Sequence, residues 1–338
     1  MSKRLDFWRQ LADALRRGES VFLTRVADST DHSPGTPGAA LFVAGDGRRI
    51  GTIGGGAMEL RWLAKAKATL ESGESVRRLV EVHHRRDVEE EPGVERSGMI
   101  CAGRQTNIDV TVTPEDLPTL EAWLLALERE RGVLRTDVDG LRVLEEDRAE
   151  PRVDRGESRG GAWHGAAWRY DETAVERRRL VILGAGHCGR ALARLMLGIG
   201  WRVCLFETRA AVVDDPDAAD LDVRLVEDFR QAASAVDYPQ LTAAVVMTTD
   251  VPNDVRALAG ALAVEFPFVG AMGSRTKLEE IRRRLLALGL PSSALDRLTA
   301  PVGLPIDSHT PPEIAVSVGA QLLACRHRWL GGAGPHGP

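Results

Sequence analysis

The chain has 338 residues, of which 43% are hydrophobic and 28% are charged, as expected for a globular protein that buries a core. Its length predicts two domains, at roughly 150 residues per domain. The formal net charge of -5 disfavours binding to nucleic acid or to an anionic membrane surface, because it provides no long-range attraction for phosphate. Small molecules or other proteins are therefore the expected partners.

Neither membrane insertion nor a disulfide framework is predicted. No segment reaches the roughly 18 consecutive apolar residues of a membrane-spanning helix, and the N-terminus has no signal-peptide cleavage pattern. The four cysteines include no CxxC pair, which argues against a structural zinc site and against disulfides in a reducing compartment. These features predict a cytoplasmic protein.

Residues 1–145 predict a mixed α/β domain. Apolar residues recur at helical spacing in the first segment, and Gly45 to Gly47 form the turn of a hairpin between two alternating segments. The predicted elements are a helix over 5–17, a strand over 20–29, a hairpin over 39–53, a helix over 57–72, and strands over 76–83 and 106–114. A glycine cluster therefore lies where a strand meets a helix.

Residues 146–178 combine mixed charge with many glycines and no sustained period, which is typical of a linker. Trp163 and Trp168 leave a second interpretation open, in which a short strand or hairpin docks onto one of the domains. The two interpretations differ in where the first domain ends.

Residues 179–330 alternate regularly between strands and helices, which predicts a doubly wound parallel sheet of the Rossmann type. The expected strands are 179–183, 201–207, 222–226, 243–248 and 267–270, and the expected helices are 187–199, 253–264, 274–288 and 311–329. Residues 331–338 are expected to form a disordered tail.

The second domain contains a dinucleotide fingerprint. Gly184, Gly186 and Gly189 follow a hydrophobic strand and open a helix, and Glu207 ends the next strand, where an acid can bind a ribose hydroxyl. The same glycines also occur in sheets that have lost their ligand, so turn geometry and packing remain an alternative. Arg209 leaves the choice between NAD and NADP open.

The first domain has its own glycine cluster, Gly54 to Gly56, which is followed by Glu59. Successive N–H groups ahead of a helix are suited to bind an anion, and a carboxylate in the first turn is favoured by the helix dipole. The alternative is that the glycines let the strand turn sharply against a neighbouring backbone. The residues alone do not decide between the two.

Cys101 is the most suggestive thiol, because it precedes Gly103 and Arg104 at a loop-to-strand junction where a nearby cation favours the thiolate. A thiolate there is suited to bind a soft metal or to carry sulfur. The alternative is a small buried hydrophobe, since Met99 and Ile100 come directly before it.

The ordered motifs of the chain resemble those of the XdhC/CoxI family of xanthine dehydrogenase accessory proteins. The motifs are "DHSPGTPGAALFV", "GTIGGGAMEL", "MICAG", "LVILGAGHCGRALARL", "VVMTTD", "FVGAMGSRTK" and "APVGLPIDSHTPPEIAVSV". The resemblance covers nearly the whole chain and implies a homodimer. It places the glycine segment of the family on Gly54, Gly55, Gly56 and Glu59, and its cysteine on Cys101. The family more often has Cys-Gly-Gly where this chain has Cys101-Ala102-Gly103.

The function that the resemblance implies is that of a molybdenum-cofactor chaperone without turnover of its own. Such a protein binds the molybdopterin cofactor during sulfuration by a cysteine desulfurase and delivers it to a xanthine dehydrogenase-type molybdenum hydroxylase. Cys101 is then a possible molybdenum ligand or sulfur carrier, and Glu59 is a second candidate for the chemistry. The alternative is an NAD(P)-dependent oxidoreductase, which the fingerprint of the second domain suggests.

Overall fold

A computed structural model describes residues 3–30, 32–84, 94–97, 103–146, 150–154 and 168–330. The chain divides into two compact units, Met1–Val175 and Glu176–Pro338. Both combine helices with sheets, and the second contains an all-parallel sheet, so the predicted α/β class is confirmed. No helix in these described ranges is long and apolar enough to cross a membrane.

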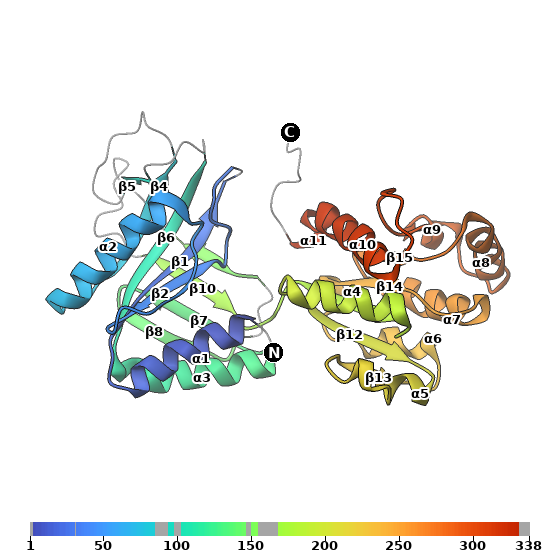
Figure 1. The fold of residues 1–338 in the computed structure, drawn as a ribbon, viewed down its shortest axis with the longest axis horizontal. Helices are drawn as coiled ribbons and strands as arrows, with labels where there is room; N and C mark the ends of the chain where they lie inside the picture. The colour runs from blue at the N-terminus through green and yellow to red at the C-terminus, as the bar shows by residue number, and fades with distance from the viewer. Residues whose placement is uncertain are drawn as a thin grey trace. The chain divides into compact units, whose positions relative to one another are not determined.

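The described residues of unit 1 form two sheets and three α-helices (Figure 1). The first sheet has the order β3-β2-β1-β6-β4-β5, and the second has the order β8-β7-β10-β9. The first sheet consists of β1 (Val21–Ser29), β2 (Ala40–Ala44), β3 (Arg49–Gly51), β4 (Arg77–His83), β5 (Val94–Arg96) and β6 (Arg104–Val112). The second consists of β7 (Val133–Asp137), β8 (Gly140–Leu144), β9 (Arg152–Asp154) and β10 (Arg169–Thr173).

The helices of unit 1 cover the two faces of the first sheet. They are α1 (Lys3–Arg16), α2 (Gly56–Ser72) and α3 (Leu117–Arg129), the last preceded by the short η1 (Pro114–Asp116). Side chains of β1 alternate between the faces: Val21 and Leu23 pack with α1 and α3, whereas Phe22 packs with α2. The predicted hairpin over 39–53 is confirmed by the antiparallel pairing of β2 with β3.

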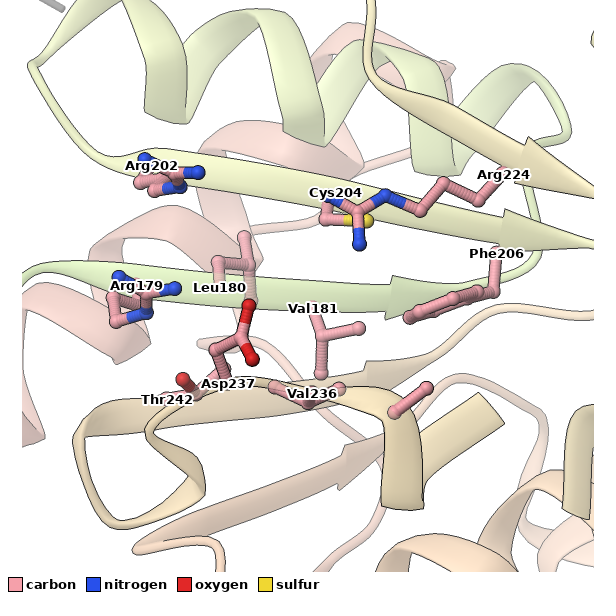
Figure 2. A pocket seen from close by; sticks show the side chains of 11 residues that line it. Arg179, Leu180, Val181, Arg202, Cys204, Phe206, Arg224, Val236, Asp237 and Thr242 are labelled. Atoms are coloured by element: carbon pink, nitrogen blue, oxygen red, sulfur yellow. The ribbon is translucent and has the colours of Figure 1, made fainter. Parts of the chain in front are cut away.

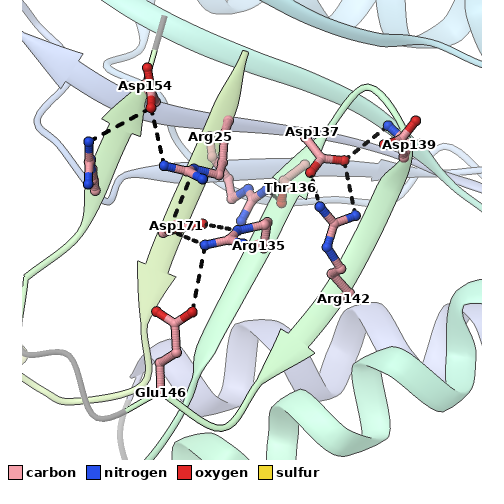
Figure 3. Close-up of polar contacts among 11 residues, drawn as sticks. Arg25, Arg135, Thr136, Asp137, Asp139, Arg142, Glu146, Asp154 and Asp171 are labelled. Carbon is pink, nitrogen blue, oxygen red and sulfur yellow. Dashed lines mark hydrogen bonds and ion pairs between the residues drawn. The ribbon is translucent and has the colours of Figure 1, made fainter. Parts of the chain in front are cut away.

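The structure corrects the predicted linker over 146–178. Five residues of β10 pair with β7, and β9 pairs with β10, so the described strands of this segment belong to the second sheet, as the second interpretation expected, and unit 1 extends to Val175. The fully buried carboxylate of Asp171 accepts two hydrogen bonds from Arg135 of β7, at 2.7 and 2.8 Å (Figure 3). Trp168 is also buried in this core, whereas Trp163 lies outside the described residues. The charges that resembled a linker thus pair within the sheet.

Unit 2 is built on a six-stranded sheet in which every pair of neighbouring strands is parallel. Its order is β13-β12-β11-β14-β15-β16, which is the order of a dinucleotide-binding fold. The strands are β11 (Arg179–Leu183), β12 (Arg202–Glu207), β13 (Val223–Leu225), β14 (Thr242–Val246), β15 (Phe268–Ala271) and β16 (Leu298–Thr299). The strand order reverses between β11 and β14, where such folds bind their ligands.

Helices cover both faces of this sheet (Figure 1). Leu180 and Ile182 of β11 pack with α4 and α10, while Val181 and Leu183 pack with α6, α7 and α8. The α-helices are α4 (His187–Gly198), α5 (Ala210–Val213), α6 (Phe229–Ala232), α7 (Val251–Leu262), α8 (Arg275–Ala287), α9 (Ser292–Leu295), α10 (Pro311–Cys325) and α11 (His327–Leu330). Short 3-10 turns occur at η2 (Pro216–Ala218), η3 (Ala233–Ala235) and η4 (Pro239–Leu241).

Candidate functional site

The glycine loop of unit 1 packs tightly against the loop that contains Gly35. A Cβ atom on Gly54 would lie 2.7 Å from the backbone nitrogen of Gly35, and one on Gly35 would lie 2.4 Å from the carbonyl oxygen of Ile53. Gly54, Gly55 and Gly56 all have positive φ angles, of 126°, 75° and 65°. The cluster therefore meets the requirements of a sharp turn and of close backbone packing.

The side chain of Gln105 on β6 joins these two loops. Its Oε1 accepts hydrogen bonds from the Gly35 N–H (3.1 Å) and from Ser33 Oγ (3.0 Å), and its Nε2 donates to the carbonyl of Ile53 (3.3 Å). A backbone N–H can only donate and a carbonyl can only accept, so these partners determine the orientation of the Gln105 amide. Gln105 is fully buried, and its bonds satisfy backbone groups of both loops.

His84 extends this buried network. Its Nε2 lies 3.1 Å from Ser33 Oγ, and because the Ser33 hydroxyl donates to Gln105, the imidazole donates through Nε2. Nδ1 is then an acceptor, and it has no hydrogen-bond partner among the described residues. Burial lowers the pKa of His84 below its ordinary value. A neutral imidazole with an unused lone pair thus lies beside the two loops.

The carboxylate of Glu59 occupies the position that the glycine loop was expected to offer to an anion. Its Oε2 accepts hydrogen bonds from Thr52 Oγ1 (2.6 Å), from the Ile53 N–H (3.2 Å) and from the Gly55 N–H (3.1 Å). The N–H of Gly54 donates to Thr52 Oγ1 (3.2 Å). Two of the three glycine N–H groups therefore have partners within the protein.

Cys101 lies outside the described residues. The described chain resumes at Gly103, whose carbonyl accepts a hydrogen bond from the backbone N–H of His84 (2.9 Å). The other three cysteines are free thiols. In the part of the chain that the structure describes, no three His, Cys, Asp or Glu side chains are arranged to bind a metal ion.

The fingerprint glycines of unit 2 have different surroundings. A Cβ atom on Gly184, where φ is 112°, would lie 2.5 Å from the Met247 carbonyl, and one on Gly189 would lie 2.2 Å from the Gly184 carbonyl. A Cβ atom added to Gly186 would have no neighbouring atom within 4 Å. Gly184 and Gly189 therefore serve the turn and the packing of α4 on the sheet, whereas Gly186 leaves the N-terminus of α4 open to an approaching group.

Glu207 is buried at the end of β12 and is held against the fingerprint loop. Its Oε2 accepts a hydrogen bond from the Ala185 N–H (3.0 Å), and both of its oxygens bond to the guanidinium of Arg209, at 3.0 and 2.8 Å. Burial would raise the pKa of Glu207, but the hydrogen bonds from Arg209, Ala185 and Thr208 outweigh it, and the pKa lies below its usual value. An ionised carboxylate therefore lies beside the loop.

A second charged cluster follows β14, the strand next to β11. The hydroxyl of Thr248 donates to Asp254 (2.6 Å), and the ammonium of Lys277 lies 2.5 Å from the other oxygen of the same carboxylate. Burial raises the pKa of Asp254, against the opposing effects of Lys277 and Thr248. The backbone N–H of Thr248 lies 2.9 Å from where a Cβ on Gly184 would be, so this cluster adjoins the fingerprint.

Comparison with known proteins identifies the family. A family model described as the XdhC and CoxI family matches residues 14–83, and one described as the XdhC Rossmann domain matches residues 180–322. The chain belongs to the XdhC/CoxI family. The first XdhC match includes Gly54 to Gly56 and Glu59, and the second includes the fingerprint and Glu207, whereas Cys101 lies in neither matched segment.

Two curated relatives match part of this XdhC-type chain. Uncharacterized protein YqeB of Escherichia coli (strain K12) is 30% identical over 157 residues, which are 46% of this chain and 29% of that protein. A probable xanthine dehydrogenase subunit of Bacillus subtilis (strain 168) is 29% identical over 150 residues, which are 44% of this chain and 43% of that protein. The chain thus spans less than half of the length of either relative.

A solved structure supports the fold over the whole XdhC chain. It is described as a xanthine dehydrogenase from Bacillus halodurans and is 22% identical, with a TM-score of 0.67 over 96% of this chain and 95% of that chain. At this identity the likeness concerns the fold of the XdhC protein, not its activity.

Sequence reasoning missed several polar residues of both regions. Ser33 lies within a quoted motif and Gln105 lies close to another, whereas His84 lies outside all of them, and only the fold shows that the three form one network. Asp254 and Lys277 lie on two different helices, α7 and α8. A usable signal was present in "GRQTNID", where three consecutive polar residues, Gln105 to Asn107, lie at the start of a predicted strand and are all buried in the structure.

Proposed function

We propose that this protein is an accessory protein of a xanthine dehydrogenase-type molybdenum hydroxylase, which binds the molybdenum cofactor during sulfuration and delivers it to the enzyme. The observation that carries the proposal is the occurrence of both XdhC models, in order, on one chain. The name of the Bacillus subtilis relative supports the hydroxylase as partner. A cysteine desulfurase, a homodimer and a cytoplasmic location belong to the same proposal through the family resemblance.

The described residues fit such a cofactor at two positions. The open N-terminus of α4 at Gly186 would receive a phosphate group, because helix N-termini present unpaired N–H groups to anions. In unit 1 the Nδ1 of buried His84, which has no partner among the described residues, would accept a hydrogen bond from the cofactor, and its Nε2 contacts Ser33. Cys101 remains the proposed soft ligand or sulfur carrier, and the cofactor supplies the redox chemistry of the hydroxylase once it is delivered.

The test is to purify the full chain from a host that synthesises the molybdenum cofactor, and to measure molybdenum and pterin. We expect both in near-stoichiometric amounts, and a large loss of molybdenum in Cys101→Ser. Cys325→Ala is the matched control, since Cys325 lies on α10, far along the chain from the glycine loop and the fingerprint. Absence of both molybdenum and pterin from the wild-type protein would refute the proposal.

A nicotinamide-dependent oxidoreductase is the second candidate. It is favoured by the geometry of the fingerprint, in which Gly186 is open and an ionised Glu207 ends the next strand. Titration calorimetry with NAD and NADP tests it directly. Saturable binding that is lost in Gly186→Val would support this candidate, and absence of binding of either nucleotide would eliminate it.

A further inference from the structure

The small pocket of unit 2 is not suited to hold a cofactor (Figure 2). Its volume of about 40 Å³ has room for only about three water-sized groups. Arg179, Arg202 and Arg224 line the pocket, and all three interact within the protein, Arg224 through hydrogen bonds of 3.1 and 2.9 Å to Asp222. A cation with more donors than partners is found elsewhere in unit 2, at Lys277.

Lys277 lies at the carboxyl end of the unit 2 sheet, as the fingerprint does. The fingerprint follows β11, Thr248 follows the neighbouring strand β14, and α8 with Lys277 follows β15, the next strand. Folds of this kind bind their ligands outside the carboxyl ends of the strands, where the strand order reverses, here between β11 and β14. Contacts from Gly184 to Thr248, and from Thr248 through Asp254 to Lys277, join the lysine to the fingerprint.

The ammonium of Lys277 is held by a buried carboxylate. An oxygen of Asp254 lies 2.5 Å from the ammonium nitrogen, and the hydroxyl of Thr248 donates to the other oxygen at 2.6 Å. The side chain of Asp254 is only 2% exposed, whereas that of Lys277 is 24% exposed. The cation is therefore the outer half of the pair, and a ligand in solution can reach it.

The ammonium of Lys277 has more donors than partners. A lysine ammonium carries three N–H donors, and among the described residues Asp254 is the one group that pairs with it. The pair as a whole is neutral, so what it offers to a ligand is hydrogen-bond donors rather than a surplus of charge. An oxygen atom of a ligand is the acceptor that fits such donors.

A lysine is an unusual choice for this chain. Of its 44 Lys and Arg residues only four are lysines, namely Lys3, Lys65, Lys67 and Lys277, and Lys277 is the only one in unit 2. Arginine suits a buried ion pair better, because its planar fork matches a carboxylate, and a buried pair is weak evidence for stability in any case. A compact ammonium is suited to contact a phosphate as a point charge. The ion pair alone therefore does not account for the lysine.

We propose that Lys277 contacts the ligand of unit 2 and donates a hydrogen bond to an oxygen of its phosphate group, with Asp254 holding the ammonium in position. This inference rests on the proposed binding of a phosphate-bearing ligand at the fingerprint, where Gly186 leaves the N-terminus of α4 open. The phosphate belongs either to the molybdenum cofactor or to a nicotinamide dinucleotide. The ammonium serves both in the same way.

Amine labelling of the full chain tests this contact, because the other three lysines all lie in unit 1. The protein is purified from a host that makes the molybdenum cofactor and from one that cannot, and the second preparation is also mixed with NAD or NADP. Each sample is treated with a trace of sulfosuccinimidyl acetate, and peptide mass spectrometry quantifies acetylation of each lysine. We expect bound ligand to slow acetylation of Lys277 about fivefold or more, without changing that of exposed Lys67. The ligand that protects Lys277 identifies the source of the phosphate.

Two variants of Lys277 test the hydrogen bond itself. Lys277→Met removes the donors, whereas Lys277→Arg keeps a cation opposite Asp254 without the compact ammonium. We expect the bound cofactor that remains after dialysis, or the calorimetric affinity for the protecting dinucleotide, to fall about tenfold in Lys277→Met and about threefold in Lys277→Arg. Arg282→Met, on the exposed side of α8, should behave like the wild type. Circular dichroism confirms that the variants fold, and the labelling of the wild type requires no variant.

The possible failures are distinguishable. If ligand is bound and Lys277 is acetylated as fast as in the empty protein, this inference is overturned and the proposed function stands. Wild-type binding in both Lys277 variants overturns it in the same way. If the protein binds neither the cofactor nor a dinucleotide, this inference fails together with both candidate functions.

Discussion

The carboxylate of Glu59 lies 3.1 Å from the backbone nitrogen of Gly55, four residues before it in the chain. Through this bond, and those from Ile53 and Thr52, the first turn of α2 binds the loop that leads into it. The carboxylate of Glu59 thus occupies the place in the glycine loop where an anion would bind. A ligand that binds to this loop would therefore bind to a surface of which Glu59 forms a part.

Replacing Glu59 by alanine should therefore destabilise unit 1. Three hydrogen bonds are lost and two backbone N–H groups lose their acceptor, so we expect the free energy of unfolding to fall by about 1–2 kcal/mol. Urea denaturation measures this change. Glu71→Ala is the matched control on the same helix, because its exposed pair with Lys67, at 3.7 Å, contributes about 0–1 kcal/mol. Equal stability of the two variants would contradict the capping role of Glu59.

His84 should make the stability of unit 1 depend on pH. Burial lowers its pKa in the folded state below the ordinary value of about 6.5, so the unfolded chain binds a proton more readily. Its contribution is complete above pH 6.5 and is lost as the pH falls through the window between that value and the lower folded pKa. Melting temperatures between pH 5 and 8 should show this decline in the wild type and in His83→Gln. A similar decline in His84→Gln would assign it to another group.

The three fingerprint glycines should respond differently to the same substitution. Gly184→Ala and Gly189→Ala would each place a methyl group within 2.5 Å of a backbone carbonyl, and we expect each to lower stability by about 3 kcal/mol. Gly186→Ala meets no atom within 4 Å and should cost about 1 kcal/mol or less. Thermal unfolding compares the three. Destabilisation by Gly186→Ala as large as that by Gly184→Ala would show that its position is not open.

Gly186→Ala then separates ligand binding from folding. If a phosphate group approaches the N-terminus of α4, the added methyl group should weaken binding at least tenfold while the protein remains folded. Calorimetry with NAD, or cofactor content after purification, gives the measurement. Unchanged binding in this variant would show that the ligand does not bind at the fingerprint.

The contributions of Asp254 and Lys277 to the free energy of unfolding should be strongly coupled. Lys277→Met leaves a buried carboxylate without its cation, which we expect to cost about 2 kcal/mol, whereas Asp254→Asn combined with Lys277→Met should cost less than Lys277→Met alone. The exposed pair of Glu280 with Arg283 is the control, with an expected coupling of about 0.5 kcal/mol. A double-mutant cycle by urea denaturation measures both. Equal couplings would mean that burial adds nothing to the Asp254 pair.

Much of the fold follows from local patterns. The helices that correspond to α1, α2, α4, α7, α8 and α10, the β2–β3 hairpin and the alternating order of unit 2 were predicted because hydrophobic periodicity and glycine positions act within a few residues, whereas α3 was not predicted. Local sequence also defines the start of α10, where Thr310 and Glu313 form a capping box. Membership of the XdhC/CoxI family also followed from motif order along the chain. The family models confirm it.

The assignment of β9 and β10 could not be made in this way. Arg169, Asp171 and Glu172 resemble exposed linker charges, and only the pairing of β10 with β7 brings Asp171 to Arg135, 36 residues away. The role of Gln105 could not be predicted for the same reason, since it accepts a hydrogen bond from Gly35, which lies 70 residues away in the sequence. A polar residue is buried at a tolerable cost only when such a distant partner is present, and a local pattern does not contain that partner.

The sequence by itself therefore determined the α/β class, the two glycine-rich segments, the fingerprint and the family, because each depends on neighbouring residues or on motif order. Only the tertiary structure decided that Glu59 occupies the glycine loop, that Gly186 alone among the fingerprint glycines is open, and that Arg179, Arg202 and Arg224 surround one pocket. These outcomes depend on strand register and on contacts between distant segments, where packing and electrostatics act through space rather than along the chain.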